Sequence, residues 1–183
     1  MKKILLIFIL VNINNIALSS IKENIIISLK NTNNLSFNFE QNINGKIETG
    51  NCIIEYPKKI FCEYDELKNK ILVANGKSLV IKTENGSYYR YAIKSTPLNY
   101  LLDKNFLIKE IKKLNERVID NKFVNFTIFR DENEINIFFD IKNFNLIGWQ
   151  TLDIYQNLNI TYLSSLKKNL ILRKNIFNLP EMN

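Results

Sequence analysis

The chain has 183 residues, with 25 Lys and Arg, 18 Asp and Glu and no His, which gives a net charge of +7 at pH 7. Without His, and with two Cys, the chain lacks the commonest general base and cannot assemble a usual four-ligand zinc site within one molecule. Its Lys and Arg residues are scattered along the sequence, which argues against nucleic-acid binding and favours weak attraction to anionic lipid or to an acidic partner.

The N-terminus has the pattern of a secretory signal peptide. Two lysines precede an apolar run from Ile4 to Val11, and small residues follow at Ala17, Ser19 and Ser20. The apolar run is too short to span the hydrocarbon core of a bilayer, which takes about 20 residues. We predict that residues 1–19 are a cleaved signal peptide and that residues 20–183 form one soluble domain outside the cytoplasm, where disulfides are stable.

The predicted mature chain opens with a helix from Ser20 to Lys30. Ser20 can cap it, and Glu23 stands at the third helical position, where it completes a capping box. The helix carries one apolar stripe, so it needs a surface to pack against. The residues of that stripe are Ile21, Ile25, Ile26 and Leu29.

From Leu35 the hydrophobic period changes to two, which predicts a strand with an apolar face that carries Phe37, Phe39, Gln41 and Ile43. Asn44-Gly45 is a favoured hairpin turn, so we expect the chain to return antiparallel. The apolar parity slips at Gly50, which predicts a β-bulge there.

A second hairpin places a cysteine on each arm. Pairing Ile54 with Ile60 and Glu55 with Lys59 also sets Cys52 opposite Cys62, with Tyr56, Pro57 and Lys58 as the turn. Directly opposed residues of an antiparallel pair are close enough for a disulfide, so we predict a Cys52–Cys62 bridge. The alternative is two buried reduced thiols that act as small apolar groups.

Alternating segments separated by turn residues continue the meander. A helix that starts at Thr96-Pro97 interrupts it, with Leu98, Leu101, Leu102 and Phe106 as its apolar stripe. The predicted strands span 71–74, 78–82, 88–94, 111–119, 123–130, 134–141, 146–153 and 160–163. Nine or ten strands in a mainly up-and-down order make a sheet that curls toward a barrel, and the two helices are the available covers for its hollow.

Several short motifs together resemble the outer-membrane lipoprotein carrier protein family, LolA. They cover essentially the whole mature chain in order and spacing. The motifs are Phe39-x-Gln41, Glu55-Tyr56-Pro57-Lys58-Lys59-Ile60, Glu63-Tyr64, Ile71-Leu72-Val73-Ala74-Asn75-Gly76, Thr96-Pro97-x-x-x-Leu101-Leu102, Leu146-Ile147-Gly148-Trp149-x-x-x-Asp153 and Ile176-Phe177-x-x-Pro180.

This resemblance implies a mainly β fold, an incomplete and strongly curved antiparallel half-barrel closed by a helical lid or plug. It implies a periplasmic, monomeric carrier without a cofactor that shelters the acyl chains of lipoproteins between the two membranes. The partners implied are an acylated lipoprotein as cargo, an inner-membrane lipoprotein-releasing ABC transporter and an outer-membrane receptor. A lipid anchor needs such a carrier, because each buried methylene contributes about 0.8 kcal/mol to membrane binding.

The resemblance also implies which residues contact lipid. The expected cavity residues are Phe37, Phe39, Ile54, Tyr56, Ile60, Val73, Leu79, Ile81, Tyr89, Tyr91, Ile137, Phe139 and Trp149, and the expected lid residues are Leu98, Leu101, Leu102 and Phe106. The family often has an arginine before the proline of the hairpin turn, where it is thought to bond the lid; here that position is Tyr56. The phenol has one donor in place of five.

Other interpretations of the same residues remain. The apolar positions can be ordinary core, and a carboxylate pair assembled by folding could support an enzyme, although no motif points to one. A different apolar-ligand binder on the same scaffold is the closer alternative, either a periplasmic lipid or glycolipid sensor or an export accessory. The outer-membrane receptor for the same cargo ordinarily needs a lipobox cysteine, which this chain lacks.

Overall fold

The computed structural model describes residues 20–65, 70–83, 85–131, 133–153 and 156–182, so the predicted signal peptide lies outside the described residues. The helices are α1 (Ile21–Lys30), η1 (Ile93–Ser95), α2 (Leu98–Leu101) and α3 (Lys104–Ile111). The strands are β1 (Asn34–Ile43), β2 (Lys46–Glu55), β3 (Lys59–Tyr64), β4 (Ile71–Asn75), β5 (Ser78–Lys82), β6 (Tyr88–Ala92), β7 (Arg117–Ile119), β8 (Phe123–Arg130), β9 (Asn133–Asp140), β10 (Leu146–Leu152) and β11 (Leu158–Lys168).

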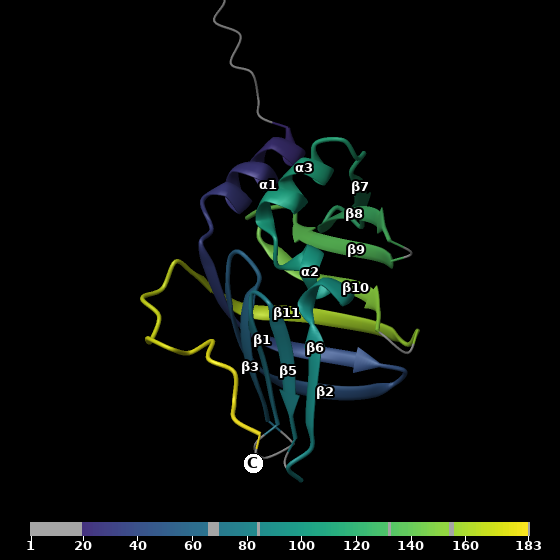
Figure 1. Cartoon of the computed structure of the whole chain (residues 1–183). Coiled ribbons are helices and arrows are strands. Elements are labelled where there is room, and N and C mark those ends of the chain that lie inside the picture. The colour runs from purple at the N-terminus through teal and green to yellow at the C-terminus, as the bar shows by residue number, and fades with distance from the viewer. Residues whose placement is uncertain (1–19, 66–69, 84, 132, 154–155, 183) are drawn as a thin grey trace, which may run out of the picture.

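The strands form one antiparallel sheet in the order β6-β5-β4-β3-β2-β1-β11-β10-β9-β8-β7. Every neighbour in this order is also the next strand in sequence, except where β1 pairs with β11 and so joins the two ends of the chain. The sheet curls without closing, and helices lie over its inner face (Figure 1). The predicted half-barrel with helical covers is therefore confirmed.

Two hairpin turns follow the expected backbone geometry. Asn44 and Gly45, between β1 and β2, have φ values of 49° and 85°, and Asp120 and Asn121, between β7 and β8, both have φ values of 51°. Positive φ at both central residues matches the right-handed twist of the flanking strands, and Asn, Asp and Gly tolerate it best. These residues thus fix the hairpin registers locally.

Helix α1 begins with the predicted capping box. The Ser20 hydroxyl accepts a hydrogen bond from the Glu23 amide at 3.2 Å, and the Glu23 carboxylate accepts one from the Ser20 amide at 3.1 Å. Its stripe of Ile25, Ile26 and Leu29 is buried, and α1 lies beside α3 at one end of the sheet (Figure 1). The predicted cover is therefore in place.

The segment after Thr96 differs from the prediction. Two helices replace one, because the Asp103 side chain accepts a hydrogen bond from the Phe106 amide at 3.1 Å and starts α3. Thr96 does not cap α2: its hydroxyl donates to the Ile93 carbonyl at 2.9 Å, in a 3-10 turn that ends the strand predicted for 88–94 early.

The strand predicted for residues 111–119 is wrong over most of its length. Ile111 is the last residue of α3, and only Arg117–Ile119 are paired, as β7. The reason is the helical spacing of Leu107, Ile108 and Ile111, which are all buried and give α3 one apolar stripe. That stripe faces α1 and the sheet, so the chain turns only after the stripe is complete.

The β-bulge predicted at Gly50 is also wrong, because β2 pairs regularly with both neighbours there. The apolar parity slips because Glu48, and not Ile47, faces the inside of the sheet. Gly50 serves a close approach instead: a Cβ at this position would lie 2.0 Å from the Glu63 carbonyl oxygen and 2.8 Å from the Phe39 ring.

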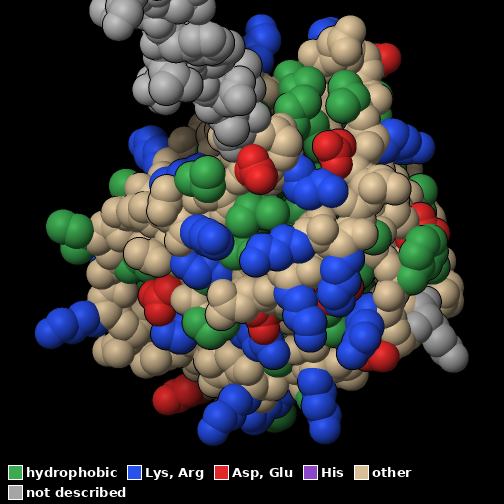
Figure 2. Space-filling view, turned by 90° about the horizontal axis from the view of Figure 1, so that it is seen from above, with side chains coloured by type: hydrophobic (Ala, Val, Ile, Leu, Met, Phe, Trp, Pro, Cys, Tyr) green, Lys and Arg blue, Asp and Glu red, His purple; other side chains and the backbone are tan. Residues whose placement is uncertain are grey.

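The C-terminal segment crosses the outer face of β3 to β5 (Figure 1). Phe177 is buried there, with the Lys59 ammonium 5.6 Å from its ring centre, and Lys82 donates to the Glu181 carbonyl at 3.4 Å. The view from above, onto the end where α1 and α3 lie, shows many Lys and Arg side chains among fewer Asp and Glu (Figure 2). Part of the basic excess is therefore exposed at this end.

Candidate functional site: an apolar cavity under a short helix

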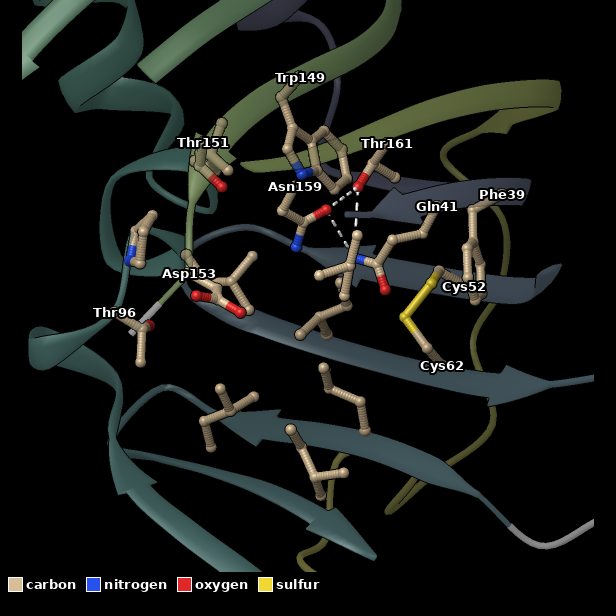
Figure 3. A pocket seen from close by; sticks show the side chains of 18 of the residues that line it. Phe39, Gln41, Cys52, Cys62, Thr96, Trp149, Thr151, Asp153, Asn159 and Thr161 are labelled. Atoms are coloured by element: carbon tan, nitrogen blue, oxygen red, sulfur yellow. Dashed lines mark hydrogen bonds between the residues drawn. A yellow bond between two sulfur atoms is a disulfide. The ribbon is translucent and has the colours of Figure 1, made fainter. Parts of the chain in front are cut away.

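A cavity of about 250 Å³ lies between α2 and the inner face of the sheet (Figure 3). Its wall includes six of the thirteen predicted cavity residues and two of the four predicted lid residues. These are Phe39, Ile60, Leu79, Ile81, Tyr91 and Trp149 from strands, with Leu98 and Leu101 from α2. The sheet therefore leaves an apolar hollow where α2 crosses it.

The remaining predicted residues lie outside the cavity wall. Phe37, Ile54, Ile137, Phe139 and Leu102 belong to the packed core. Phe106 stacks on Tyr100 with ring centres 5.0 Å apart, and Tyr89 is 48% exposed. Core and cavity positions share one face of the sheet. A residue belongs to the core where α1 and α3 cover that face, and it lines the cavity where they do not.

Val73 lies on the other face of the sheet. It pairs with Phe61 and Val80, and Phe61 shares a strand face with Lys59, over which Phe177 packs. Leu72, the residue before Val73, lines the cavity instead of Val73. Because side chains alternate along a strand, an assignment shifted by one residue exchanges the two faces.

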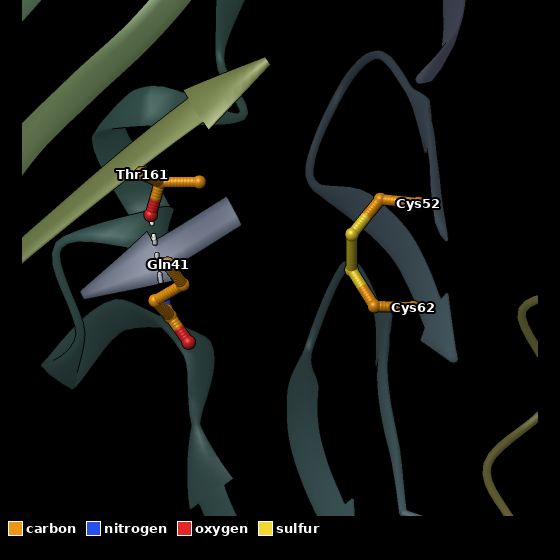
Figure 4. Close-up of a disulfide and its surroundings, with 4 residues drawn as sticks. All are labelled: Gln41, Cys52, Cys62 and Thr161. Carbon is orange, nitrogen blue, oxygen red and sulfur yellow. Dashed lines mark hydrogen bonds between the residues drawn. A yellow bond between two sulfur atoms is a disulfide. The ribbon is translucent and has the colours of Figure 1, made fainter. Parts of the chain in front are cut away.

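The cysteine hairpin has the predicted register, with Cys52 opposite Cys62, Ile54 opposite Ile60 and Glu55 opposite Lys59. The structure joins the two sulfurs in a disulfide, with Cα atoms 4.1 Å apart (Figure 4). Both cysteines line the cavity, so the bridge stiffens the wall that faces α2.

The tip of this hairpin contacts the helical cover through Lys58. Its amide donates to the Leu102 carbonyl at 2.7 Å, and its ammonium lies 3.7 Å from the Asp103 carboxylate. Tyr56 is partly buried as a residue, but its hydroxyl is buried and has no hydrogen-bond partner among the described residues, and this burial raises its pKa. The residue that joins the hairpin to the cover is therefore the one after the proline, and not the one before it.

A row of polar side chains crosses the cavity wall, and sequence reasoning missed most of it. Thr161 on β11 stands opposite both Trp149 and Gln41, and Gln41 stands opposite Glu48. The Gln41 amide donates to Asn159 Oδ1 at 3.0 Å (Figure 3) and to Thr161 Oγ1 at 3.4 Å (Figure 4). The signal for this row was Gln41, a polar residue on the apolar face of its predicted strand.

Glu48 continues this row as a buried carboxylate with only 5% of its surface exposed. It accepts hydrogen bonds from the Lys46 ammonium at 2.7 Å and the Lys70 ammonium at 2.5 Å. Lys70 also lies 4.0 Å from the ring centre of Tyr64, whose pKa is raised by burial and by the charge of Glu48. The Glu48 carboxylate and the Lys70 ammonium both line the cavity, so their charges compensate each other in its wall.

We expect Glu48 to make the free energy of unfolding fall as the pH is lowered. Burial works to raise the pKa of this carboxyl, but the hydrogen bonds and charges of Lys46 and Lys70 outweigh it and hold the pKa below 4.5. A lowered pKa means that the ionised group stabilises the fold above about pH 4.5 and that this contribution is lost as the pH falls through the folded-state value.

Urea unfolding between about pH 6 and pH 3 measures this contribution. The free energy of unfolding should fall more steeply with acid in the native protein than in the Glu48→Gln variant, which cannot titrate at this position. An equally steep loss in both proteins would show that Glu48 does not carry the effect.

The sequence model of the family described as outer membrane lipoprotein carrier protein LolA matches residues 30–180. The chain belongs to the LolA family. This confirms the resemblance given by the motifs. No curated protein matches the chain.

Solved structures superpose on this chain at low sequence identity. An uncharacterized conserved protein from Thermus thermophilus superposes with a TM-score of 0.50 at 6% identity, over 85% of this chain and 93% of the other. A LolA superfamily protein from Nitrosomonas europaea has a TM-score of 0.44 at 8% identity, over 88% and 99% of the two chains. MucB has a TM-score of 0.49 at 10% identity, over 88% and 62%.

The LolA fold binds hydrophobic ligands, and the family consists of periplasmic carriers and binding proteins rather than enzymes. Within the described part of the chain, no group of three or more His, Cys, Asp or Glu side chains is placed to hold a metal ion. None of the helices in that part is both long and apolar enough to cross a membrane. The cavity under α2 is an apolar hollow within the described part of this LolA chain.

Proposed function

We propose that this protein is a periplasmic carrier that shelters the acyl chains of lipoproteins in the cavity under α2 and shuttles them from the inner to the outer membrane. An inner-membrane ABC transporter would load it, and the cargo would leave at the outer membrane, with or without a receptor. The signal peptide predicted for residues 1–19 and the single domain predicted for residues 20–183 fit this route.

The observation that carries the proposal is an apolar cavity closed by a helix that interrupts an otherwise continuous meander. Residues of α2 line the same space as residues of the strands: Leu98 and Leu101 share the cavity wall with Leu79 and Ile60. Acyl chains and lid side chains therefore compete for one apolar surface. Such competition allows uptake and release without covalent chemistry, with the direction set by the partners at either end.

The volume of the cavity indicates that the structure is a closed form. About 250 Å³ lies below the range of about 300–1,000 Å³ typical of pockets for drug-sized ligands, and two or three acyl chains are larger still. Helix α2 is only four residues long, and Lys58 connects the hairpin tip to its C-terminal carbonyl. Loading would move α2 away from the sheet and break this hydrogen bond.

The basic end of the molecule supports docking at membranes. Lys30 of α1, Lys109 of α3 and the two lysines after α3, Lys112 and Lys113, are exposed. Anionic lipids attract such residues by about 1 kcal/mol each near the surface. This attraction is weak and is screened by salt, so it would hold a carrier near a membrane without retaining it.

We expect Leu98→Asp to weaken binding of a neutral fluorescent apolar probe by at least about tenfold, because a carboxylate would be desolvated against the ligand. Leu98 is only partly buried, so the free energy of unfolding should change little. Leu114→Asp is the matched control, since Leu114 is also partly buried against the core but does not line the cavity. Equal weakening by both variants would contradict the lid role of Leu98.

Native mass spectrometry and lipid extraction on mature protein from the periplasm test the function itself. An acylated lipoprotein bound one to one would support the carrier. Free lipid or glycolipid in its place would overturn the carrier in favour of a sensor or an export accessory on the same fold. An empty protein would be tested for release of lipoproteins from inner-membrane vesicles, and failure to release them would overturn the proposal.

A further inference from the structure

The polar end of the cavity contains side-chain atoms that other described residues do not satisfy. Gln41 uses its Nε2 atom as a donor, and no described residue hydrogen-bonds its Oε1 atom. The same holds for Asn159 Nδ2 and for the Thr151 hydroxyl. Figure 3 shows these side chains projecting into the cavity from β1, β11 and β10.

The pairing of the two amides decides what they present to a ligand. Because Gln41 donates to Asn159, the outer atoms are an acceptor on Gln41 and a donor on Asn159. Exchanging the orientation of both amides exchanges these roles and again leaves one donor and one acceptor. The cavity wall therefore offers a donor and an acceptor side by side in either arrangement.

The surroundings hold this pair in place. Thr161, only 3% exposed, donates to Asn159 Oδ1 at 3.3 Å and accepts from Gln41. On the other side of Gln41 stands Glu48, which is buried and bound by two lysines. Side chains fixed by neighbours on both sides lose less freedom when a ligand binds, which favours specific recognition.

The uncharged polar side chains of the cavity wall are grouped near the β1–β2 turn, where Ile43 and Leu152 also line the wall. Toward the β1–β2 turn the wall carries Gln41, Asn159 and Thr151, whereas farther from this turn it carries Phe39 and the Cys52–Cys62 disulfide. An amphiphile would place its chain in the apolar part and its linking group against the polar part. A hydrocarbon without a linking group would leave the outer donor and acceptor of the amide pair without a partner, which costs binding free energy.

We propose that this polar end is a subsite for a secondary amide attached to an acyl chain. The inference rests on the proposed function and names the linkage that the cavity recognises. A secondary amide carries one N–H donor and one carbonyl acceptor, which match the exposed acceptor and donor of the Gln41–Asn159 pair. An ester matches only the donor. The amide is either an N-acyl linkage or a peptide bond next to an acylated residue.

Two ligands that differ by one group test the subsite, namely N-methyldodecanamide and methyl dodecanoate. Their affinities are measured by displacement of a neutral fluorescent probe, in the native protein and in Gln41→Met. The variant keeps the length of the side chain and removes both of its polar atoms. It should weaken amide binding about three- to tenfold and change ester binding by less than about twofold.

The control variant is Thr127→Val, which removes a cross-strand hydrogen bond of 2.6 Å to Asn136 without touching the cavity. It should leave both affinities unchanged. If both ligands bind and Gln41→Met weakens them equally, or weakens neither, the amide subsite is overturned and the carrier stands. If neither ligand binds the native protein, the apolar ligand site of the proposed function fails with it.

A pair of lipopeptides separates the two sources of the amide. One carries two ester-linked chains and a free amino terminus, and the other carries a third chain on that amino group. If Gln41→Met weakens only the second, the recognised group is the N-acyl linkage. Equal weakening of both identifies the peptide bond, and no weakening of either overturns the subsite.

Discussion

Replacing Phe126 with Ala is expected to lower the free energy of unfolding by about 3–5 kcal/mol. Phe126 is fully buried on β8 and packs edge to face against Phe139 on β9, with ring centres 6.1 Å apart. The substitution removes an aromatic ring from the inner face of the sheet, where neighbours can close the space only in part. The loss combines the transfer free energy of the ring with the cost of the remaining cavity.

The same strand supplies the matched control. Phe129 lies three residues later, points out of the core and is 73% exposed, so Phe129→Ala should change stability by less than about 0.5 kcal/mol. Urea unfolding monitored by circular dichroism measures both variants. A loss of similar size in the two would mean that the inner face of β8 is assigned to the wrong residues.

Sequence reasoning succeeds in this protein where a pattern is local. Asn44-Gly45 determines a turn by its backbone preferences, and the opposed Cys52 and Cys62 determine a register, because one alignment satisfies three cross-strand pairs. The long-range pairing of β1 with β11 has no comparable local pattern in the sequence. It was not predicted, although it joins the two halves of the sheet.

The candidate site was predictable only in part, for a physical reason. Core and cavity side chains are both apolar and share one face of the sheet, so Phe37 and Phe39 are equivalent in sequence. In the structure Phe37 packs in the core, with its ring centre 6.3 Å from that of Trp149, while Phe39 lines the cavity. The difference depends on where the helices lie over the sheet, which a hydrophobic period does not encode.

The polar residues of the cavity wall could be recognised, in contrast, because they are exceptions to the hydrophobic alternation of their strands. Gln41 breaks the apolar face of β1, and the shift of parity near Gly50 reflects a buried Glu48. From the sequence alone, the shift of parity predicted a bulge at Gly50, and Gln41 was placed on the apolar face of its strand. Because Gln41 and Glu48 stand directly opposite each other on paired strands, they mark one polar end of the cavity.

Replacing both Cys52 and Cys62 with Ala is expected to cost about 3 kcal/mol of stability. The bridge spans a sequence separation of 10 residues, and the estimate follows from the freedom that the unfolded chain gains without it. For a domain of this size the loss corresponds to a fall in melting temperature of about 6–12 °C. Reducing agent should destabilise the native protein by a similar amount and leave the double variant unchanged.

The adjacent cross-strand pair distinguishes this effect from a general weakening of the hairpin. Asn51 and Glu63 stand opposite each other one residue along the strands and point to the other face. Replacing both with Ala should cost less than about 1 kcal/mol, the upper range for one cross-strand pair. If reducing agent leaves the native protein unchanged, the cysteines are free thiols in the folded chain. The cavity wall then owes its stiffness to the strand pairing and to the packing of Ile54 against Ile60.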